Sequence, residues 1–187
     1  MTSNHWFTDD DFHRDLAMQA ATDNDAALLK DLLAKFPVTK GDDTWLGYMM
    51  EDYMGALQPE CARLLVEAGL NLNISDHGFL PLHVAIDRGG KLACQLVKVL
   101  LGGGADPNLH GFNDWTALHR AVRCQPDNHD LLAVLLDGGA NPNIRTRIDH
   151  YETPIEAARR SGNPDAAKFI ETRWTPSPRP RKPARRR

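Results

Sequence analysis

Two phrases recur in the same order along the chain, and this recurrence limits the possible folds more than any other feature. A helix-start phrase reads LPLHVA at 80–85, TALHRA at 116–121 and TPIEAA at 153–158. A turn phrase reads GADPN at 104–108 and GANPN at 139–143, with a weaker copy, GLNLN, at 69–73. Corresponding positions lie 35 to 37 residues apart. This regular spacing predicts an array of stacked units instead of one globular core.

The residue types in both phrases suit particular places in a helix–turn–helix unit. Thr116 and Thr153 can accept hydrogen bonds from the free amides at the start of the following helix. Pro81 and Pro154 suit the first helical position, where a missing N–H costs nothing. A glycine ends each second helix, where a left-handed backbone is favoured, and an Asp/Asn-rich tight turn follows it. These glycines are Gly69, Gly104 and Gly139.

The phrases divide residues 1–171 into about five helical pairs. We expect the units at 1–36, 42–73, 77–109, 112–144 and 150–171. In the last three units the helices are expected at 81–88 and 91–101, at 117–123 and 127–136, and at 154–160 and 164–171. Residues 172–187 hold four prolines and clustered arginines, which predicts a basic, disordered tail outside the array.

The first two units follow the pattern less closely. In the first unit a helical stripe is expected at Phe12, Leu16, Ala17, Ala20 and Ala21. Its second helix should begin at Asn24 or Asp25, end before Pro37 and bury Ala27, Leu28, Leu29, Leu32 and Leu33. In the second unit Thr44 stands at the expected helix start, but residues 45–50 depart from the phrase.

The pattern resembles the ankyrin repeat, whose motif is Thr-Pro-Leu-His-x-Ala, a leucine-rich helix and Gly-Ala-Asp-x-Asn. The leucine-rich helix reads LVKVLL at 96–101 and LLAVLL at 131–136. The resemblance is best in 77–109 and 112–144, good in 150–171 and loose in 1–73. It implies an all-α ankyrin-repeat solenoid of helix–turn–helix units joined by hairpin-like fingers. It also implies that His83 and His119 lie inside their units, hydrogen-bonded to backbone or threonine.

Two departures from the family spacing are visible. The family has fewer residues between the histidine and the glycine, so the turns between helices are lengthened near Gly89 and near 125–127. The stretch from Asn143 to Thr153 is also longer than the equivalent stretch from Asn108 to Thr116. We therefore expect the finger at 144–152 to project further than its neighbours.

Charge and cysteine content narrow the class of protein. The net charge of −3 combines −10 in residues 1–171 with +7 in the tail, and residues 1–60 alone carry −8. Three cysteines, Cys61, Cys94 and Cys124, lie in helical patterns and predict buried, reduced thiols instead of disulfides or a zinc site. No apolar run is long enough to span a membrane, and residues 1–6 do not resemble a secretory signal. We expect a cytoplasmic protein that is monomeric on its own.

No motif for catalysis accompanies the repeats. The triplet at 102–104 follows a helix instead of leading into one, so it is no phosphate loop, and no nucleophile motif is present. Acidic pairs such as Asp42 and Asp43 suit solvated helix starts. We expect no enzyme activity, cofactor, metal or small-molecule substrate.

Binding through a surface is the remaining prediction. By the resemblance, the partner is another protein, bound at the finger tips and on the exposed side of the first helices. Phe79 and Trp115 precede the helix-start phrase, where aromatic side chains make good interface anchors. They could equally pack sideways onto adjacent fingers. The candidate partner-binding residues are His77, Phe79, Asp87, Arg88, His110, Phe112, Asn113, Trp115, Arg123, Arg145, Arg147, His150, Tyr151 and Arg160.

Several roles fit such a binding module. It could mask or scaffold one protein, neutralise a cognate toxin as an immunity protein, or capture a host protein as a secreted effector. The basic tail leaves nucleic-acid association open as a separate class.

Overall fold

The computed structural model describes residues 9–37, 57–74, 79–125, 127–148 and 150–174, with side chains from residue 13 onwards. The helical pairs are α1 (Asp9–Thr22) with α2 (Ala26–Lys35), α5 (Pro81–Asp87) with α6 (Gly90–Gly102), α7 (Ala117–Cys124) with α8 (His129–Asp137), and α9 (Pro154–Arg160) with α10 (Pro164–Arg173). Helix α4 (Pro59–Glu67) stands between α2 and α6, and a short 3-10 turn, η2, spans Phe112–Asp114. The first helix expected in 42–73 lies outside the described residues, and so do residues 45–50, which depart from the helix-start phrase.

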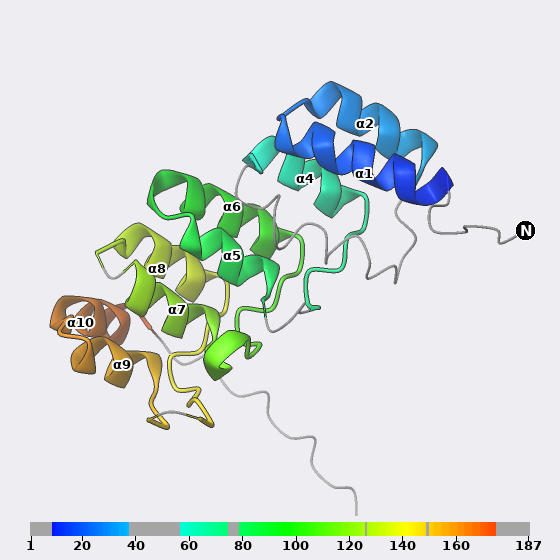
Figure 1. Cartoon of the computed structure of the whole chain (residues 1–187). Coiled ribbons are helices and arrows are strands. Elements are labelled where there is room, and N and C mark those ends of the chain that lie inside the picture. Colours follow the sequence, from blue (N-terminus) through cyan, green and yellow to red (C-terminus); the bar gives the residue numbers. More distant parts are fainter. Residues whose placement is uncertain (1–8, 38–56, 75–78, 126, 149, 175–187) are drawn as a thin grey trace, which may run out of the picture.

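The pairs stack side by side into a solenoid, so the predicted all-α array is confirmed (Figure 1). Helices α5, α7 and α9 contact one another in sequence and form one layer, the front row. Helices α2, α4, α6, α8 and α10 form the second layer, the back row. The two fingers, residues 109–115 and 144–152, lie in the long connections from α6 to α7 and from α8 to α9. Every unit therefore contacts chiefly its neighbours, as a linear array requires.

The expected cap and turn residues take their predicted places. Pro81 and Pro154 are the first residues of α5 and α9. Thr153 Oγ1 accepts from the Glu156 amide at 3.3 Å, and the Glu156 carboxylate accepts from the Thr153 amide at 2.8 Å. This reciprocal pair is a capping box, which satisfies two amides at the helix start. The glycines after α4, α6 and α8 have φ of 92 to 95°, as a left-handed helix end favours.

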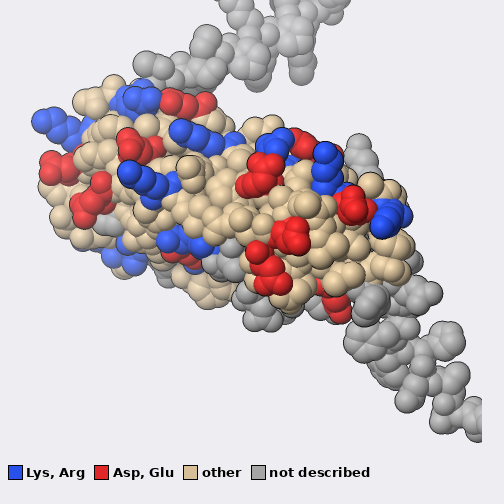
Figure 2. Space-filling model, turned by 90° about the horizontal axis from the view of Figure 1, so that it is seen from above, with Lys and Arg blue, Asp and Glu red and all other residues tan. Residues whose placement is uncertain are grey.

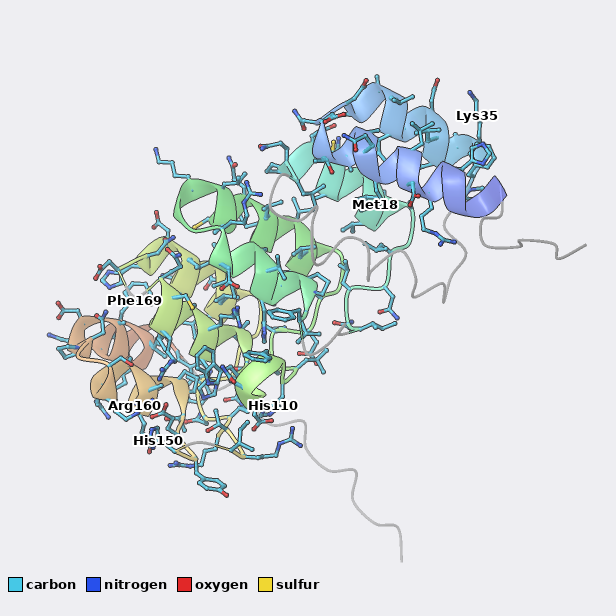
Figure 3. The ribbon with its side chains drawn as sticks, viewed as in Figure 1. Met18, Lys35, His110, His150, Arg160 and Phe169 are labelled. Carbon is cyan, nitrogen blue, oxygen red and sulfur yellow. The ribbon has the colours of Figure 1, made fainter. Side chains whose placement is uncertain are left out.

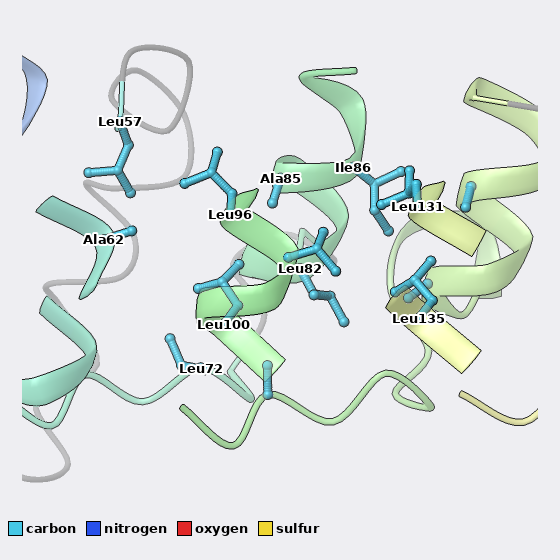
Figure 4. Close-up of a cluster of buried hydrophobic side chains, with 14 of the residues drawn as sticks. Leu57, Ala62, Leu72, Leu82, Ala85, Ile86, Leu96, Leu100, Leu131 and Leu135 are labelled. Carbon is cyan, nitrogen blue, oxygen red and sulfur yellow. The ribbon is translucent and has the colours of Figure 1, made fainter. Parts of the chain in front are cut away.

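The core is continuous along the stack and consists of small and branched apolar side chains. Leu82, Ala85 and Ile86 of α5 meet Leu96 and Leu100 of α6 (Figure 4). The units approach so closely that a side chain at some glycine positions would force a neighbouring side chain to move. A Cβ at Gly103 would lie 2.3 Å from Val66 Cγ1, and one at Gly138 would lie 2.5 Å from Leu101 Cδ1. Close contact between units is thus built into the ends of the back-row helices.

Two expectations about burial are wrong. Leu28 is 41% exposed and Leu16 is 36% exposed, although both belong to the predicted apolar stripes. The helices that pack against α1 and α2 cover a narrower arc of each helix than the predicted stripe spans. Residues within that arc, such as Leu29 and Leu32, are buried. Cys61 is buried, but Cys94 is only half-buried and Cys124 is exposed because it ends α7. All three thiols are free, and burial raises their pKa.

The asparagine that closes each turn phrase joins consecutive units. Asn73 Oδ1 accepts from the Asp106 amide at 2.7 Å, and its Nδ2 donates to the Gly104 carbonyl at 3.0 Å. Asn108 repeats this contact with the Asn141 amide at 2.7 Å and the Gly139 carbonyl at 3.0 Å. One amide side chain thus satisfies a donor and an acceptor of the next turn. The phrase therefore specifies stacking as well as the turn itself.

The two repeat histidines differ in their hydrogen bonding. His119 Nδ1 accepts from the Thr116 amide at 3.2 Å and contacts Thr116 Oγ1 at 2.8 Å, so the ring proton lies on Nε2. Nε2 lies 3.0 Å from the Glu152 carbonyl, which accepts that proton. The internal hydrogen bonding implied by the family resemblance is confirmed for His119. His83 is equally buried, yet its Nδ1 has no partner among the described residues because Leu80 occupies the position of the threonine.

Replacing Asn108 by Ala should lower the free energy of unfolding by about 1–2 kcal/mol, because two hydrogen bonds between units are lost. Asn143 holds the same place in the last turn phrase, and its side chain joins no further turn among the described residues. The Asn143→Ala variant is therefore the matched control and should change stability little. Urea unfolding of both variants measures the difference, and equal losses would contradict the role of Asn108.

Stability should fall as the pH drops below the ordinary histidine range. Burial, together with nearby Arg120, lowers the pKa of His83 to about 3, and burial also lowers the pKa of His119. In the unfolded chain both rings bind a proton near pH 6.5, so acid favours unfolding. Between about pH 7.5 and about pH 5, His83 alone should cost about 2 kcal/mol. The His83→Gln variant should lose this part of the slope, and an unchanged slope would refute the assignment.

Candidate functional site

The two fingers are joined to each other through Asp114. This carboxylate lies in the first finger, here residues 109–115, and its backbone, like that of Asn113, is left-handed with φ of 57 and 60°. Arg147 of the second finger, residues 144–152, donates from Nη2 and Nε to Asp114 Oδ1 at 2.6 and 3.1 Å. The Arg147 amide donates to the other carboxylate oxygen. The left-handed pair is thus held in place by the neighbouring finger.

His110 completes the surroundings of Asp114. Its Nδ1 lies 2.9 Å from the Asp114 carbonyl and 3.1 Å from Oδ1. Burial alone would raise the pKa of Asp114, but the side-chain and backbone hydrogen bonds from Arg147 hold it below its ordinary value. The carboxylate is therefore ionised at neutral pH while it is buried, and Arg147 supplies the charge that makes this possible.

Glu152 plays the corresponding part at the base of the second finger. It is buried, and Arg160 of α9 grips it with Nε and Nη2 at 2.7 and 2.6 Å. Arg123 approaches the same carboxylate at 3.8 Å and lies over the Trp115 ring, 4.7 Å from its centroid. The hydrogen bonds from Arg160 hold the pKa of Glu152 below its ordinary value, although burial alone would raise it.

Aromatic and charged side chains continue this pattern along the front row. Phe79 stacks on Phe112 of the first finger, with ring centroids 5.4 Å apart. Arg120 lies 5.9 Å from the centroid of Phe79 and makes two hydrogen bonds to Asp87, one of 2.7 Å. Each arginine that contacts a ring is thus also fixed by an acid from a neighbouring unit.

The outer edge of the second finger is held by Arg145. Its Nη1 and Nη2 bind the Glu156 carboxylate at 2.8 Å each, and Nη1 also donates to the Tyr151 carbonyl at 2.7 Å. Tyr151 has a left-handed backbone with φ of 50°. Hydrogen bonds from Arg145 and the burial of Glu152 hold the chain on both sides of this strained residue. Backbone strain is therefore concentrated in the two fingers.

Most of the candidate residues come together at one end of the units. Figure 3 shows His110, His150 and Arg160 near the fingers, far from Met18 and Lys35. Phe79 and Trp115 are both half-buried. Phe79 packs sideways onto Phe112 of the first finger, as the alternative expected, whereas Trp115 contacts Arg123 of α7. Arg88 is half-buried at the end of α5, and His77 lies outside the described residues. Whether the group binds a partner stays a prediction.

Sequence reasoning missed the acids that organise this surface. Asp114 and Glu152 were not among the candidates, nor were Arg120 and Ile148. The available signal was the spacing, since Asp114 and Arg147 lie 33 residues apart, close to one repeat. In an array such a separation places two residues side by side on neighbouring units.

Arginine and lysine are segregated between the two sides of residues 79–172. The fingers and front row hold only arginines: Arg88, Arg120, Arg123, Arg145, Arg147, Arg159 and Arg160. The back-row helices α6 and α10 hold the lysines Lys91, Lys98 and Lys168, and α10 also ends on an arginine, Arg173. Figure 2 shows both signs of charge intermingled on the face seen from above. Arginine is enriched at protein interfaces and lysine is depleted there, because guanidinium is less strongly hydrated and binds carboxylates bidentately.

The described part of the chain contains neither a metal-binding cluster nor a helix that could span a membrane. Within those residues, no group of three or more His, Cys, Asp or Glu could hold a metal ion. None of the described helices combines the length and apolarity needed to cross a bilayer.

Comparison with known proteins supports the repeat architecture. Residues 90–172, from the start of α6 into α10, match a family model described as ankyrin repeats in three copies. Ankyrin repeats are generally protein–protein interaction modules and are typically non-catalytic. No curated protein matches the chain.

Replacing Asp114 by Asn should loosen the joint between the fingers without preventing the left-handed backbone, which asparagine tolerates. The amide of Arg147 then loses its charged acceptor, and its hydrogen exchange should become about tenfold faster or more. The control is Glu156→Gln, which removes the charge from the exposed pair with Arg145, while glutamine can still accept from the Thr153 amide in the capping box. Amide exchange followed by NMR measures both variants, and an unchanged rate at Arg147 in Asp114→Asn would contradict the joint.

Proposed function

We propose that the chain binds another protein through its two fingers and the front row, because residues 90–172 are similar to ankyrin repeats, which are generally protein–protein interaction modules. In this role it masks or scaffolds its partner and carries out no chemistry itself. Neutralising a toxin and capturing a host protein are finer versions of the same role, and both would use the same surface.

The observation that carries the proposal is the exposure of apolar side chains at the finger tips. Phe112 is 47%, Ile148 50% and Tyr151 65% exposed. Large apolar groups gathered on neighbouring loops lose contact with water when a partner covers them, and burial of each stabilises a complex. Such groups are also typical interface anchors when they are aromatic.

The rigidity of the fingers adds to this argument. Asp114 and Glu152 are buried and bound by arginines, so the chain is held at Asp114, Arg147 and Glu152 before any partner arrives. A preformed surface loses less conformational entropy on binding than a loop that must become ordered. The fixed arginines of the front row extend the surface beyond the tips.

The proposal is tested by a photoreactive amino acid placed at position 148, with position 28 as the control. Leu28 is exposed to a similar degree but lies on α2, far from the fingers. In the native cell extract, crosslinking from 148 should give a discrete protein adduct, and crosslinking from 28 should not.

A double variant, Ile148→Ala with Tyr151→Ala, should bind that partner about tenfold more weakly than the parent protein, or weaker still. Leu28→Ala should leave the affinity unchanged. A partner that crosslinks from both positions, or that binds the double variant as tightly as the parent, would exclude the fingers as the binding surface.

A further inference from the structure

We propose that the partner presents to the fingers an acidic protein segment in which carboxylates alternate with apolar side chains. This inference rests on the proposed function and names the chemistry of the partner at the same surface.

The first reason is the direction in which the finger charges point. The described acids of the fingers, Asp114 and Glu152, are buried, whereas the side chain of Arg147 is 74% exposed and that of Arg145 is 57% exposed. Among the described residues of the two fingers, no carboxylate is exposed; Asp149 lies outside them. The described residues of the fingers therefore offer guanidinium donors to the solvent and keep their two carboxylates, Asp114 and Glu152, buried.

The second reason is the geometry of these guanidinium groups. In Arg147, the Nε and Nη2 atoms bind Asp114, and in Arg160 the same two atoms bind Glu152. A guanidinium has five N–H donors, and a carboxylate that grips one edge orients the rest of the group. Oriented donors match the planar oxygens of a partner carboxylate better than mobile lysines do.

The third reason is the apolar neighbourhood of the arginines. Phe112, Ile148 and Tyr151 stand on the same two fingers. When a partner covers them, water is excluded and the nearby charge-assisted hydrogen bonds become stronger. A segment that carries only carboxylates would leave these side chains in water, so the fitting segment has both kinds of residue.

A nucleic acid fits this surface less well than an acidic protein segment. Arg147, Arg145 and Arg120 are each paired with an acid of this chain, so the surface has little net charge to attract a phosphate backbone from a distance. Binding to a duplex depends on the neutralisation of several phosphates by unpaired cations. Recognition at short range, by oriented donors beside apolar groups, suits a carboxylate-bearing peptide.

The test introduces a charge at position 148. Ile148 is half-exposed, and its side chain makes none of the contacts between Asp114 and Arg147 that join the fingers. The probe is a synthetic peptide that combines glutamates and leucines, with a twin in which every glutamate is glutamine. By fluorescence anisotropy at low salt, the glutamate peptide should bind about tenfold tighter than its twin. Ile148→Lys should tighten binding of the glutamate peptide about threefold, and Ile148→Asp should weaken it about tenfold.

Opposite effects of the two substitutions support an acidic partner, because both remove the same apolar group. Equal weakening by both, or equal binding of the peptide and its twin, would overturn the inference. Lys98→Asp on the back row is the matched control and should change nothing. Thermal unfolding of each variant checks that the fold is kept.

Two further outcomes separate this inference from the proposed function. If position 148 crosslinks to a protein but neither peptide binds, the binding role stands and the acidic partner is refuted. If duplex DNA competes with the glutamate peptide and its binding responds to Ile148→Asp in the same way, the surface recognises polyanions, and the inference fails.

Discussion

The contact between one unit and the next is the constraint on which the rest of this structure depends. No helical pair encloses its own apolar face, so every unit is completed by its neighbour. The asparagines at 73 and 108 make this dependence specific, because each binds an amide and a carbonyl of the following turn. Gly103 and Gly138 allow the same turns to approach side chains of the preceding unit. The array therefore has one register, and the fingers project from it at a fixed spacing.

That spacing determines what the fingers can do. Asp114 and Arg147 are separated by about one repeat, so they meet across two fingers and tie them together. Glu152 does the same between the second finger, α7 and α9. Buried carboxylates are costly unless they are paired, and here each pairing partner is an arginine from another element. The result is a surface on which arginines and aromatic rings are held in place, with apolar groups exposed at the tips.

The helix starts and the turns after the helices were well predicted because their residues have local tasks. Helix starts at Pro81 and Pro154, the capping box at Thr153 and the left-handed glycines follow from short-range backbone chemistry. The candidate surface was only partly predictable, since it depends on pairs that meet across units. Trp115 was identified as an unusual residue, but its position under Arg123 came from the stacking. The burial predicted for the Cys124 thiol was wrong, because Cys124 is the last residue of α7 and is exposed there.

The sequence by itself determined the class of fold and the starts of helices such as α5 and α9, because a repeated phrase encodes the same local hydrogen bonds each time. It also determined that two histidines would be internal. Only the tertiary structure decided that His119 is fully bonded while His83 lacks a partner for Nδ1, since this depends on Leu80 and on the carbonyl of the next finger. Only the tertiary structure decided which charges face the solvent. The stacking buries Asp114 and Glu152 and leaves their arginines outside, and no pattern within one unit records that difference.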